Sequence, residues 1–305
     1  MLSFLVPAYN CADVVGEAVA SALGQELEID LEVVVVDDAS IDATAAVLEK
    51  LAAADERVRV HRHEANAGGG AARNTAAGLA HGDLLYVVDS DNVLEPGTAA
   101  AVVAHQRSTG ADAVSPETQR FFDGTTGRPR HTWRMPAVDG RSTLMHALTE
   151  VGVPAAHGNY LYTRRLFDAV GGYEVDLGAM DTWTFGFKHL AHGFDVAIAP
   201  GAAYRHRLDR PSHDSYWTRQ QKTGANEAHA LMGIRRQIDR LPHGVRVKVE
   251  TLEPGDPVFA LVAERLFADD VTLEVFRKGV ERLRASAPVP PRTTVRERLG
   301  ALLGR

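Results

Sequence analysis

Two clusters of acidic and hydroxyl side chains stand directly after apolar runs in the first hundred residues. Asp37 and Asp38 follow the run 33–36, and the acidic stretch 89–91 follows the run 84–88. Residues that follow the strands of an open parallel sheet meet at one edge, where ligands bind. Two pairs of carboxylates at one edge repel each other unless a cation lies between them. Magnesium or manganese carrying a diphosphate would fit, because these ions take oxygen ligands from both protein and phosphate. Either cluster alone is equally typical of a turn or a helix cap.

A glycine-rich segment, 66–74, offers a second place for phosphate. Backbone amides at the start of a helix can cradle an anion. The segment is not a dinucleotide-binding fingerprint, because Arg73 stands at the third glycine position and the turn after the first strand, 8–10, contains no glycine. This argues against a dehydrogenase. Arg73 itself suits a phosphate or an acidic cluster.

Parallel strands joined by helices would place these residues at one edge. The run 33–36 is apolar on both faces, which predicts a strand inside a sheet that helices cover on each side. The expected fold class is therefore α/β, with a mostly parallel central sheet flanked by helices. The pattern predicts strands over 2–6, 31–36, 58–61 and 84–88, and helices over 13–23, 41–53 with Ser40 as N-cap, 70–80, and from Pro96 towards Gly110.

The second half is less regular until about residue 142. Scattered Pro, Gly and Arg over 115–140 predict an irregular excursion that faces the substrate. Further elements are expected over 164–170, 181–192 and 194–198, and from residue 214 the chain reads as mostly helical. A proline-rich linker at 288–291 precedes a short amphipathic stretch, 295–303, which serves packing, dimerisation or contact with a membrane surface.

Composition is that of a folded protein, with 45% hydrophobic and 24% charged residues in 305. The single cysteine, Cys11, excludes an intrachain disulfide and favours a reducing compartment. The start of the chain has no charged leader and no run is long enough to span a bilayer, so we expect a cytoplasmic protein, with peripheral membrane contact left open. The net charge of −7 argues against general nucleic-acid binding.

Several segments, taken in order, resemble the family 2 glycosyltransferases, which have the nucleotide-diphospho-sugar transferase fold called GT-A. Four motifs in the right order are far more specific than any one alone. The similarity covers roughly 1–206 and implies a GT-A domain over 1–210, with a donor half (1–110) and an acceptor half (111–210), followed by a helical extension over 211–305. The matching segments are Val6–Asn10 with Ser21 and Gln25, Val36–Ser40 with Asp42 and Thr44, Asn66–Asn74, Gly82–Asp91, Arg164–Phe167, Gly171–Tyr173 and Gly193–Phe194.

The resemblance implies roles for the residues at the sheet edge. Asp89-Ser90-Asp91 resembles the family's DXD motif, in which Asp91 would bind Mn²⁺ or Mg²⁺ together with His206, and the metal would offset charge on the departing diphosphate. The donor, a UDP-sugar by resemblance, would contact Pro7, Ala8, Tyr9, Asp37, Asp38, Gly68, Arg73, Asp89 and Ser90. On the acceptor side, Trp133, His157, Asn159 and Tyr160 are candidates, because aromatic faces stack on sugar rings, although aromatics are more often core residues.

The catalytic base is where the sequence departs from the family pattern. Inverting members carry Glu then Asp at the start of a helix, whereas this chain reads Met180-Asp181-Thr182. Counting from Gly171 places Asp181 on the base, and counting back from Gly193 places Thr182 there. Asp181 is preferred, because a carboxylate accepts a proton near pH 7 and a threonine hydroxyl does not. The reaction expected is a single displacement with inversion onto an unidentified hydroxyl acceptor.

Two rival functions follow from the same residues. A non-catalytic nucleotide-sugar-binding protein would keep the fold without turnover, as the ambiguity at 180–182 allows. A nucleotidyltransferase would be expected to carry a basic, glycine-rich loop after the first strand, which 8–10 does not provide. The helical C-terminal third, which is net basic, is a candidate homodimer surface.

Overall fold

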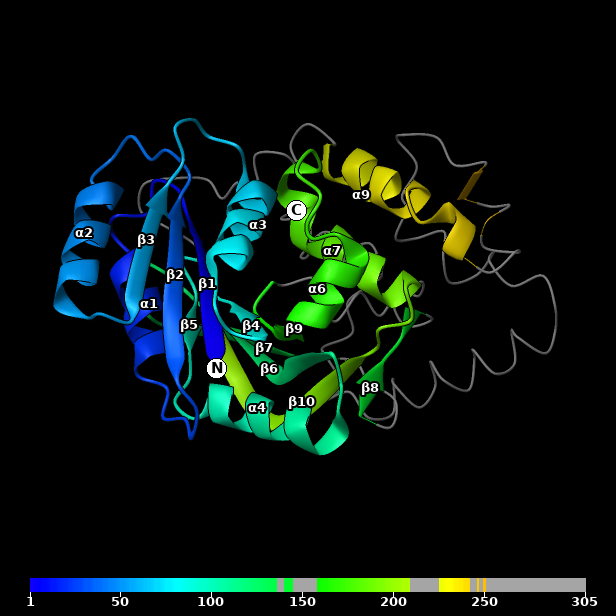
Figure 1. The fold of residues 1–305 in the computed structure, drawn as a ribbon, viewed down its shortest axis with the longest axis horizontal. Coiled ribbons are helices and arrows are strands. Elements are labelled where there is room, and N and C mark those ends of the chain that lie inside the picture. Colours follow the sequence, from blue (N-terminus) through cyan, green and yellow to red (C-terminus); the bar gives the residue numbers. More distant parts are fainter. Residues whose placement is uncertain (136–139, 145–157, 209–224, 242–245, 247–248, 251–305) are drawn as a thin grey trace.

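The computed structural model describes residues 1–135, 140–144, 158–208, 225–241, 246 and 249–250 (Figure 1). Within this part of the chain the strands form one mixed sheet in the order β3-β2-β1-β4-β9-β6-β10-β5, with β7 paired to β6 and β8 to β10. The strands are β1 (Leu2–Ala8), β2 (Leu31–Asp37), β3 (Val58–Arg62), β4 (Leu84–Val87), β5 (Val93–Leu94), β6 (Ala113–Phe122), β7 (Pro129–Arg134), β8 (Arg141–Ser142), β9 (Leu161–Thr163) and β10 (Val196–Arg207).

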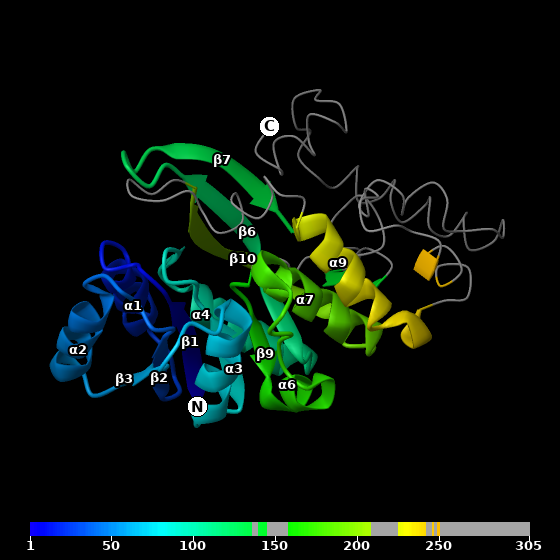
Figure 2. The same ribbon diagram turned by 90° about the horizontal axis from the view of Figure 1, so that it is seen from above.

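Helices cover the sheet on both faces (Figures 1 and 2). They are α1 (Val15–Leu23), α2 (Thr44–Ala54), α3 (Gly69–Leu79), α4 (Thr98–Thr109), α6 (Arg164–Val170), α7 (Asp181–Ala191) and α9 (Ala225–Arg235), with 3-10 turns η2 (Gly178–Met180) and η3 (Ile238–Arg240). Val33 and Val35 of β2 face the layer of α1, α2 and α4, while Val34 and Val36 face the layer of α3, α6 and α7. The expected burial of this strand on both faces is confirmed, and so is the α/β fold.

The first four strands agree with the sequence prediction to within two residues at each end. Strands β1 to β4 are mutually parallel where they pair. Their carboxyl ends therefore lie along one edge, as the argument from the acidic clusters required.

The expected irregular excursion over 115–140 is wrong for most of its length. Residues 113–122 form β6, which pairs with β10 in parallel and with β7 in antiparallel register, opposing Gln119 to Trp133. Pro116, which had argued against a strand, lies beside a register shift between β6 and β10, where a missing N–H is tolerated. Figure 2 shows β7 beside β6, away from α3.

Two helix starts also differ from the prediction. Ser40 is not an N-cap, because α2 begins at Thr44, whose N–H donates to the Asp42 carboxylate at 2.9 Å. Pro96 does not open α4, since Gly97 takes a left-handed conformation and the helix starts at Thr98.

The C-terminal part is described through α9, η3 and residues 241, 246 and 249–250. Helix α9 packs against α7 and η2, and the helical character of the later extension, the expected boundary near 210 and the stretch 288–303 lie outside the described residues. No helix in the described ranges is both long and apolar enough to cross a bilayer.

Candidate active site

The loops that follow β1 and β2 are fastened to each other. Asn10 donates its N–H to Ser40 Oγ at 3.0 Å, and its own Oδ1 accepts the N–H of Ile41 at 2.9 Å. Asn10 and Ala39 both have positive φ, 47° and 59°, a conformation that non-glycine residues rarely adopt. Such backbone strain concentrates at ligand sites, where the surrounding structure holds it in place.

Asp38 is the residue that holds the glycine-rich segment. Its Oδ1 contacts His63 Nδ1 at 2.7 Å and accepts the N–H of Ala67 at 2.9 Å, while its Oδ2 accepts the N–H of Gly68 at 2.8 Å. The residue is buried. The carboxylate therefore occupies amides that the sequence offered to a phosphate, and it fixes the entry to α3, where Gly68 has a φ of 91°.

Asp37 and Tyr9 are placed differently from Asp38. Asp37 Oδ1 accepts the N–H of Ser40 at 2.9 Å, whereas its buried Oδ2 accepts no hydrogen bond within the described chain and lies 3.5 Å from Arg62 Nη1. Tyr9, after β1, leaves 43% of its surface exposed, which is high for a ring of this size. Pro7 and Ala8 end β1, and the Ala8 carbonyl accepts the Asp38 N–H at 2.8 Å. An exposed ring beside polar strand ends can stack on a planar base.

The acidic turn after β4 is closed by its own residues and by an asparagine from the other half of the sequence. Asn159 Oδ1 accepts the N–H of Asp89 at 2.9 Å, and its Nδ2 donates to Asp89 Oδ2 at 3.0 Å. The turn also brings Asn92 N–H to the Asp89 carbonyl at 2.9 Å, which leaves Ser90 and Asp91 half-buried at its tip. Asn159, predicted on the acceptor side, thus holds the donor-side Asp89.

The end of β10 lies against the same turn. Arg207 donates from Nε to the Asp91 carbonyl at 3.0 Å and from its N–H to Asn92 Oδ1 at 3.2 Å. His206, the preceding residue, packs its ring against that of Phe121, and the two ring centres are 5.1 Å apart. The chain therefore brings Arg207, the residue after His206, against the backbone of Asp91 from a position far away in the sequence.

Of the two predicted metal ligands, His206 has the chemistry of one. His206 Nδ1 is buried and has no hydrogen-bond partner within the described chain. Burial lowers the pKa of His206 to about 4, although the Asp89 charge opposes this, so the imidazole is neutral near pH 7 and has a lone pair to donate. No three His, Cys, Asp or Glu side chains of the described residues form a metal cage. Mn²⁺ or Mg²⁺ needs fewer protein ligands when phosphates complete its coordination.

Arg73 joins the acidic turn to the start of α7. Its Nη2 donates to Asp89 Oδ1 at 2.7 Å and its Nη1 to Asp181 Oδ2 at 2.8 Å. Burial raises the pKa of Asp181, and the nearby Arg73 charge opposes part of that rise. A buried carboxylate with a raised pKa is typical of catalytic bases as well as of structural ion pairs.

Thr182 lies on the other side of the same helix end. Gly158 has a φ of 76°, and a methyl group added to it would lie 3.1 Å from Thr182 Cγ2 and 3.3 Å from Asp89 Oδ2. Asp181 Oδ1 accepts the Thr182 N–H at 2.6 Å. Asp181 and Thr182 therefore both border the acidic turn, one through Arg73 and the other against Gly158.

The two remaining acceptor candidates that the structure describes, Tyr160 and Trp133, both pack into or against the core. Tyr160 is 1% exposed and belongs to the hydrophobic core with Tyr162 and Phe185, which removes its ring from contact with an acceptor. Trp133 is half-buried on β7 and packs against that core. His157 lies outside the described residues.

His63 and Gly158 were missed by the sequence argument. His63 directly follows β3, so the rule that singled out residues after strands applies to it as well. Its Nε2 contacts Thr75 Oγ1 of α3 at 2.9 Å, which orients the ring towards Asp38. Nothing in the local sequence marks Gly158, because its importance comes from the approach of Thr182 and Asp89.

The strand order and the helices on both faces of the sheet define a GT-A fold of the nucleotide-diphospho-sugar transferase type. Solved structures agree at the level of fold. Staphylococcus aureus TarS 1–349 in complex with UDP has a TM-score of 0.60 at 18% identity, covering 93% of this chain and 82% of that one. The mannosyltransferase PcManGT from Pyrobaculum calidifontis, in complex with GDP-Man and Mn²⁺, has a TM-score of 0.59 at 19% identity, covering 99% and 79%.

The chain belongs to glycosyl transferase family 2, whose family model matches residues 3–171. It is 42% identical over 110 residues to the succinoglycan biosynthesis protein ExoO of Rhizobium meliloti (strain 1021), which is 36% of this chain and 31% of ExoO. It is 41% identical over 96 residues to the chondroitin synthase of Pasteurella multocida (strain Pm70), which is 32% of this chain and 10% of the synthase. The matched region therefore spans a third or less of each relative's length.

Proposed function

We propose that this protein transfers a sugar from a nucleotide-diphosphate donor, a UDP-sugar, to a hydroxyl acceptor with inversion at the anomeric carbon. The observation that carries the proposal is the convergence of the acidic turn 89–92, the end of β10 and the start of α7 at one edge of the sheet. Membership of family 2 supports the reaction class. The names of similar structures supply donor candidates, since one holds UDP-GlcNAc and another GDP-Man with Mn²⁺.

The donor would lie across the ends of β1, β2 and β4. In this proposal Tyr9 stacks on the nucleobase, and Asp37 Oδ2, which lies 3.5 Å from Arg62 Nη1, accepts a hydrogen bond from the base or the ribose. Asp38 acts indirectly, by holding Gly68 and the entry to α3. Asp91 and His206 would hold Mn²⁺ or Mg²⁺, which when bound offsets negative charge on the diphosphate.

Asp181 is the proposed base. The acceptor oxygen attacks the anomeric carbon, the bond from that carbon to the diphosphate oxygen breaks, and the acceptor proton passes to the Asp181 carboxylate. The nucleoside diphosphate leaves with the bonding electrons, and an α-linked donor gives a β-linked product. The raised pKa of Asp181 favours proton uptake.

Screening of donors tests both the ligand class and the metal. We expect UDP or a UDP-sugar with Mn²⁺ to raise the melting temperature, and Asp91→Ala to abolish the metal-dependent part of that rise. Asp168→Ala, at an exposed position on α6, is the matched control and should behave as wild type. An Asp91→Ala protein with an unchanged metal-dependent shift would contradict the metal assignment.

A non-catalytic nucleotide-sugar-binding protein is the second candidate. It is favoured by one observation, that both oxygens of Asp181 already accept hydrogen bonds, from Arg73 and from the Thr182 N–H. Incubation with Mn²⁺, the donors and a panel of hydroxyl acceptors separates the two candidates. Donor binding without transfer or slow donor hydrolysis would favour the binding protein, whereas turnover that Asp181→Asn abolishes and Thr182→Val preserves would favour the transferase.

A further inference from the structure

The guanidinium of Arg73 is shared between two carboxylates from distant parts of the chain. Asp89 comes from the turn after β4 and Asp181 from the first residue of α7, and each accepts one hydrogen bond from a different Nη atom of Arg73. The guanidinium lies over the Tyr173 ring, with 5.7 Å between Arg73 Cζ and the centre of the ring. Arg73 thus connects the side of the site that carries the acidic turn to the side that carries the proposed base.

The surroundings leave little room for Arg73 to contact a donor phosphate. Only 9% of its side chain is exposed, and its Nε is buried without a hydrogen-bond partner within the described chain. A phosphate ligand requires guanidinium N–H groups that point into the open site. Here both terminal nitrogens are directed at carboxylates.

Two neighbouring residues, Gly69 and Asn159, favour the contacts of Arg73 with Asp181 and Asp89. A methyl group on Gly69 would lie 2.8 Å from both Arg73 Nη1 and Asp181 Oδ2, so the absence of a side chain there makes room for the ion pair. Asn159 independently fixes Asp89 through two hydrogen bonds. The rigid, planar fork of the guanidinium therefore couples the position of the Asp181 carboxylate to that of Asp89.

We infer that Arg73 is a positioning residue, which sets the separation and orientation of Asp181 relative to the Asp89 turn, rather than a ligand of the donor phosphates. The inference rests on the proposed function, because it takes Asp181 as the base and the Asp89 turn as the donor side. A small displacement of a reacting group lowers turnover strongly, by about a hundredfold for 1 Å. Donor binding through Tyr9, Asp37 and Asp91 does not pass through Arg73.

Arg73→Lys is the decisive variant. Lysine keeps the positive charge, but its single ammonium group cannot span both carboxylates as the guanidinium does. We expect kcat to fall by about ten- to a hundredfold, while KM for the donor and the thermal shift with UDP and Mn²⁺ stay within about twofold of wild type. Arg73→Gln should lower kcat at least as far.

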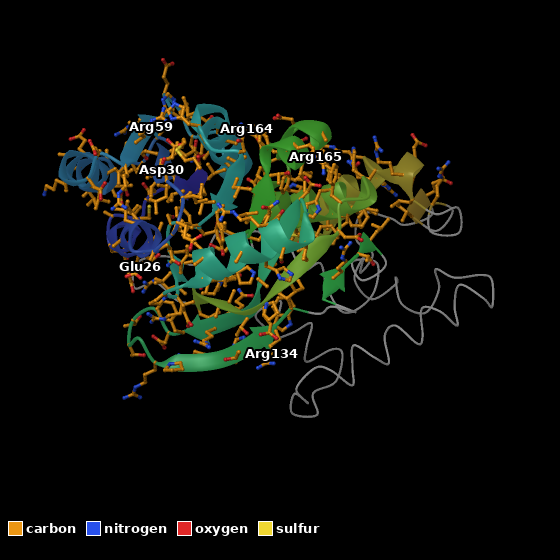
Figure 3. The ribbon with its side chains drawn as sticks, turned by 60° about the horizontal axis from the view of Figure 1, so that its bottom comes forward. Glu26, Asp30, Arg59, Arg134, Arg164 and Arg165 are labelled. Atoms are coloured by element: carbon orange, nitrogen blue, oxygen red, sulfur yellow. The ribbon has the colours of Figure 1, made fainter. Side chains whose placement is uncertain are left out.

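Arg164→Lys is the matched control. Arg164 lies at the start of α6 (Figure 3) and donates to the carbonyls of Ala77, Ala80 and Gly82, at the opposite end of α3 from Gly69. We expect this variant to lose stability without losing kcat. If the Arg73 variants do not fold, Gly69→Ala keeps both charges and pushes a methyl group into the Arg73–Asp181 contact, with Gly78→Ala on the same helix as its control.

The outcomes separate the inference from the proposed function. A wild-type protein that transfers sugar and an Arg73→Lys protein with undiminished kcat would overturn the inference alone. A raised donor KM at unchanged kcat would also overturn it, because that result identifies Arg73 as a donor ligand. Wild-type protein that transfers from no donor would overturn the proposed function, and the role of Arg73 with it.

Discussion

The Asp38 carboxylate contacts one imidazole and two backbone amides, and these contacts limit its capacity to bind a nucleotide directly. His63 and the amides of Ala67 and Gly68 occupy both carboxylate oxygens. Asp37, one residue earlier, keeps an oxygen that accepts no hydrogen bond within the described chain and has Arg62 Nη1 3.5 Å away. We therefore expect Asp37 to contact the donor directly and Asp38 to shape the loop around it.

Replacement of His63 tests this division. His63→Ala removes one contact from the buried Asp38 carboxylate and one from Thr75, which costs about 1–3 kcal/mol of unfolding free energy. The glycine-rich entry to α3 loosens as a result, and we expect the affinity for UDP to fall by about tenfold, or 1.4 kcal/mol. Titration calorimetry and urea unfolding measure the two effects.

His63→Asn is the control for this prediction, because an asparagine amide can donate in place of Nδ1 while the contact to Thr75 is lost. It should bind UDP within about threefold of wild type, well under 1 kcal/mol. Equal affinities for the alanine variant and the wild type would show that Asp38 holds the loop without this histidine.

The sequence alone brought the carboxylates to one edge but could not say which of them are engaged. The residues that saturate Asp38 lie 25 to 30 positions away in the chain, and the one that fastens Asp89, Asn159, lies 70 away. Such contacts depend on how the loops pack, and the periodicity of a strand does not predict that packing. The same reason explains why Tyr160, which was expected to contact the acceptor, lies in the core instead.

Helix α3 agrees with its predicted bounds to within one residue, while β6 and β7 were missed. The start of α3 has a local signal, the glycine-rich segment before a helix. Strand β6 has none, because its main partner, β10, lies about 80 positions later and Pro116 breaks the apolar alternation. Local signals therefore predicted the donor half better than the acceptor half.

Two glycines of α3 separate helix propensity from packing. A methyl group on Gly70 would meet the Glu174 carbonyl at 2.3 Å, whereas one on Gly78 meets nothing within 4 Å. Gly78→Ala should raise the unfolding free energy by about 0.5–1 kcal/mol. Gly70→Ala should lower it by about 1–3 kcal/mol, because a backbone carbonyl cannot rotate away as a side chain can. Urea unfolding checks the difference in sign, and stabilisation by Gly70→Ala would contradict the close packing of α3 on the 171–177 loop.

Helix α7 contains a buried histidine from which we expect a pH-dependent stability. His189 is fully buried, its Nδ1 contacts the Phe194 carbonyl at 2.9 Å, and burial lowers its pKa to about 4. The unfolded chain takes up a proton at this residue near pH 6.5, before the folded chain does. The contribution is fully favourable above pH 6.5 and is lost as the pH falls towards 4.

His189→Asn should therefore flatten the pH dependence while keeping a donor for the Phe194 carbonyl. Between pH 7 and pH 5 we expect its unfolding free energy to fall by about 1–2 kcal/mol less than that of wild type. His61→Asn, at an exposed position, should keep the wild-type slope. Urea unfolding at the two pH values provides the comparison, and parallel slopes for His189→Asn and wild type would remove this histidine as the cause.

At the scale of the whole molecule, the proposed site combines loops at the ends of the sheet strands with the start of a helix that covers one face of the same sheet. The donor side comes from the ends of β1, β2 and β4, and the proposed base comes from α7, which α9 covers on its far side (Figure 1). Arg236, just after α9, donates to both Asp176 and Glu174, in the loop that leads to α7. Helix α9 and the residue after it therefore brace the loop that leads to the start of α7.

The contact between α9 and α7 can be tested by a compensating pair. A methyl group on Gly233 of α9 would lie 2.3 Å from Thr184 Cγ2, so Gly233→Ala should push the helices apart and lower the unfolding free energy by about 1–3 kcal/mol. Thr184→Ser removes that methyl group and keeps the hydroxyl that donates to the Met180 carbonyl at 2.8 Å. The double variant should regain part of the lost stability, because the two substitutions are in contact and their effects are not additive.

Because α7 begins with Asp181, we expect kcat to fall in Gly233→Ala and to recover in the double variant. A loss of stability that Thr184→Ser does not reduce would show that α9 does not dock on α7 in this way.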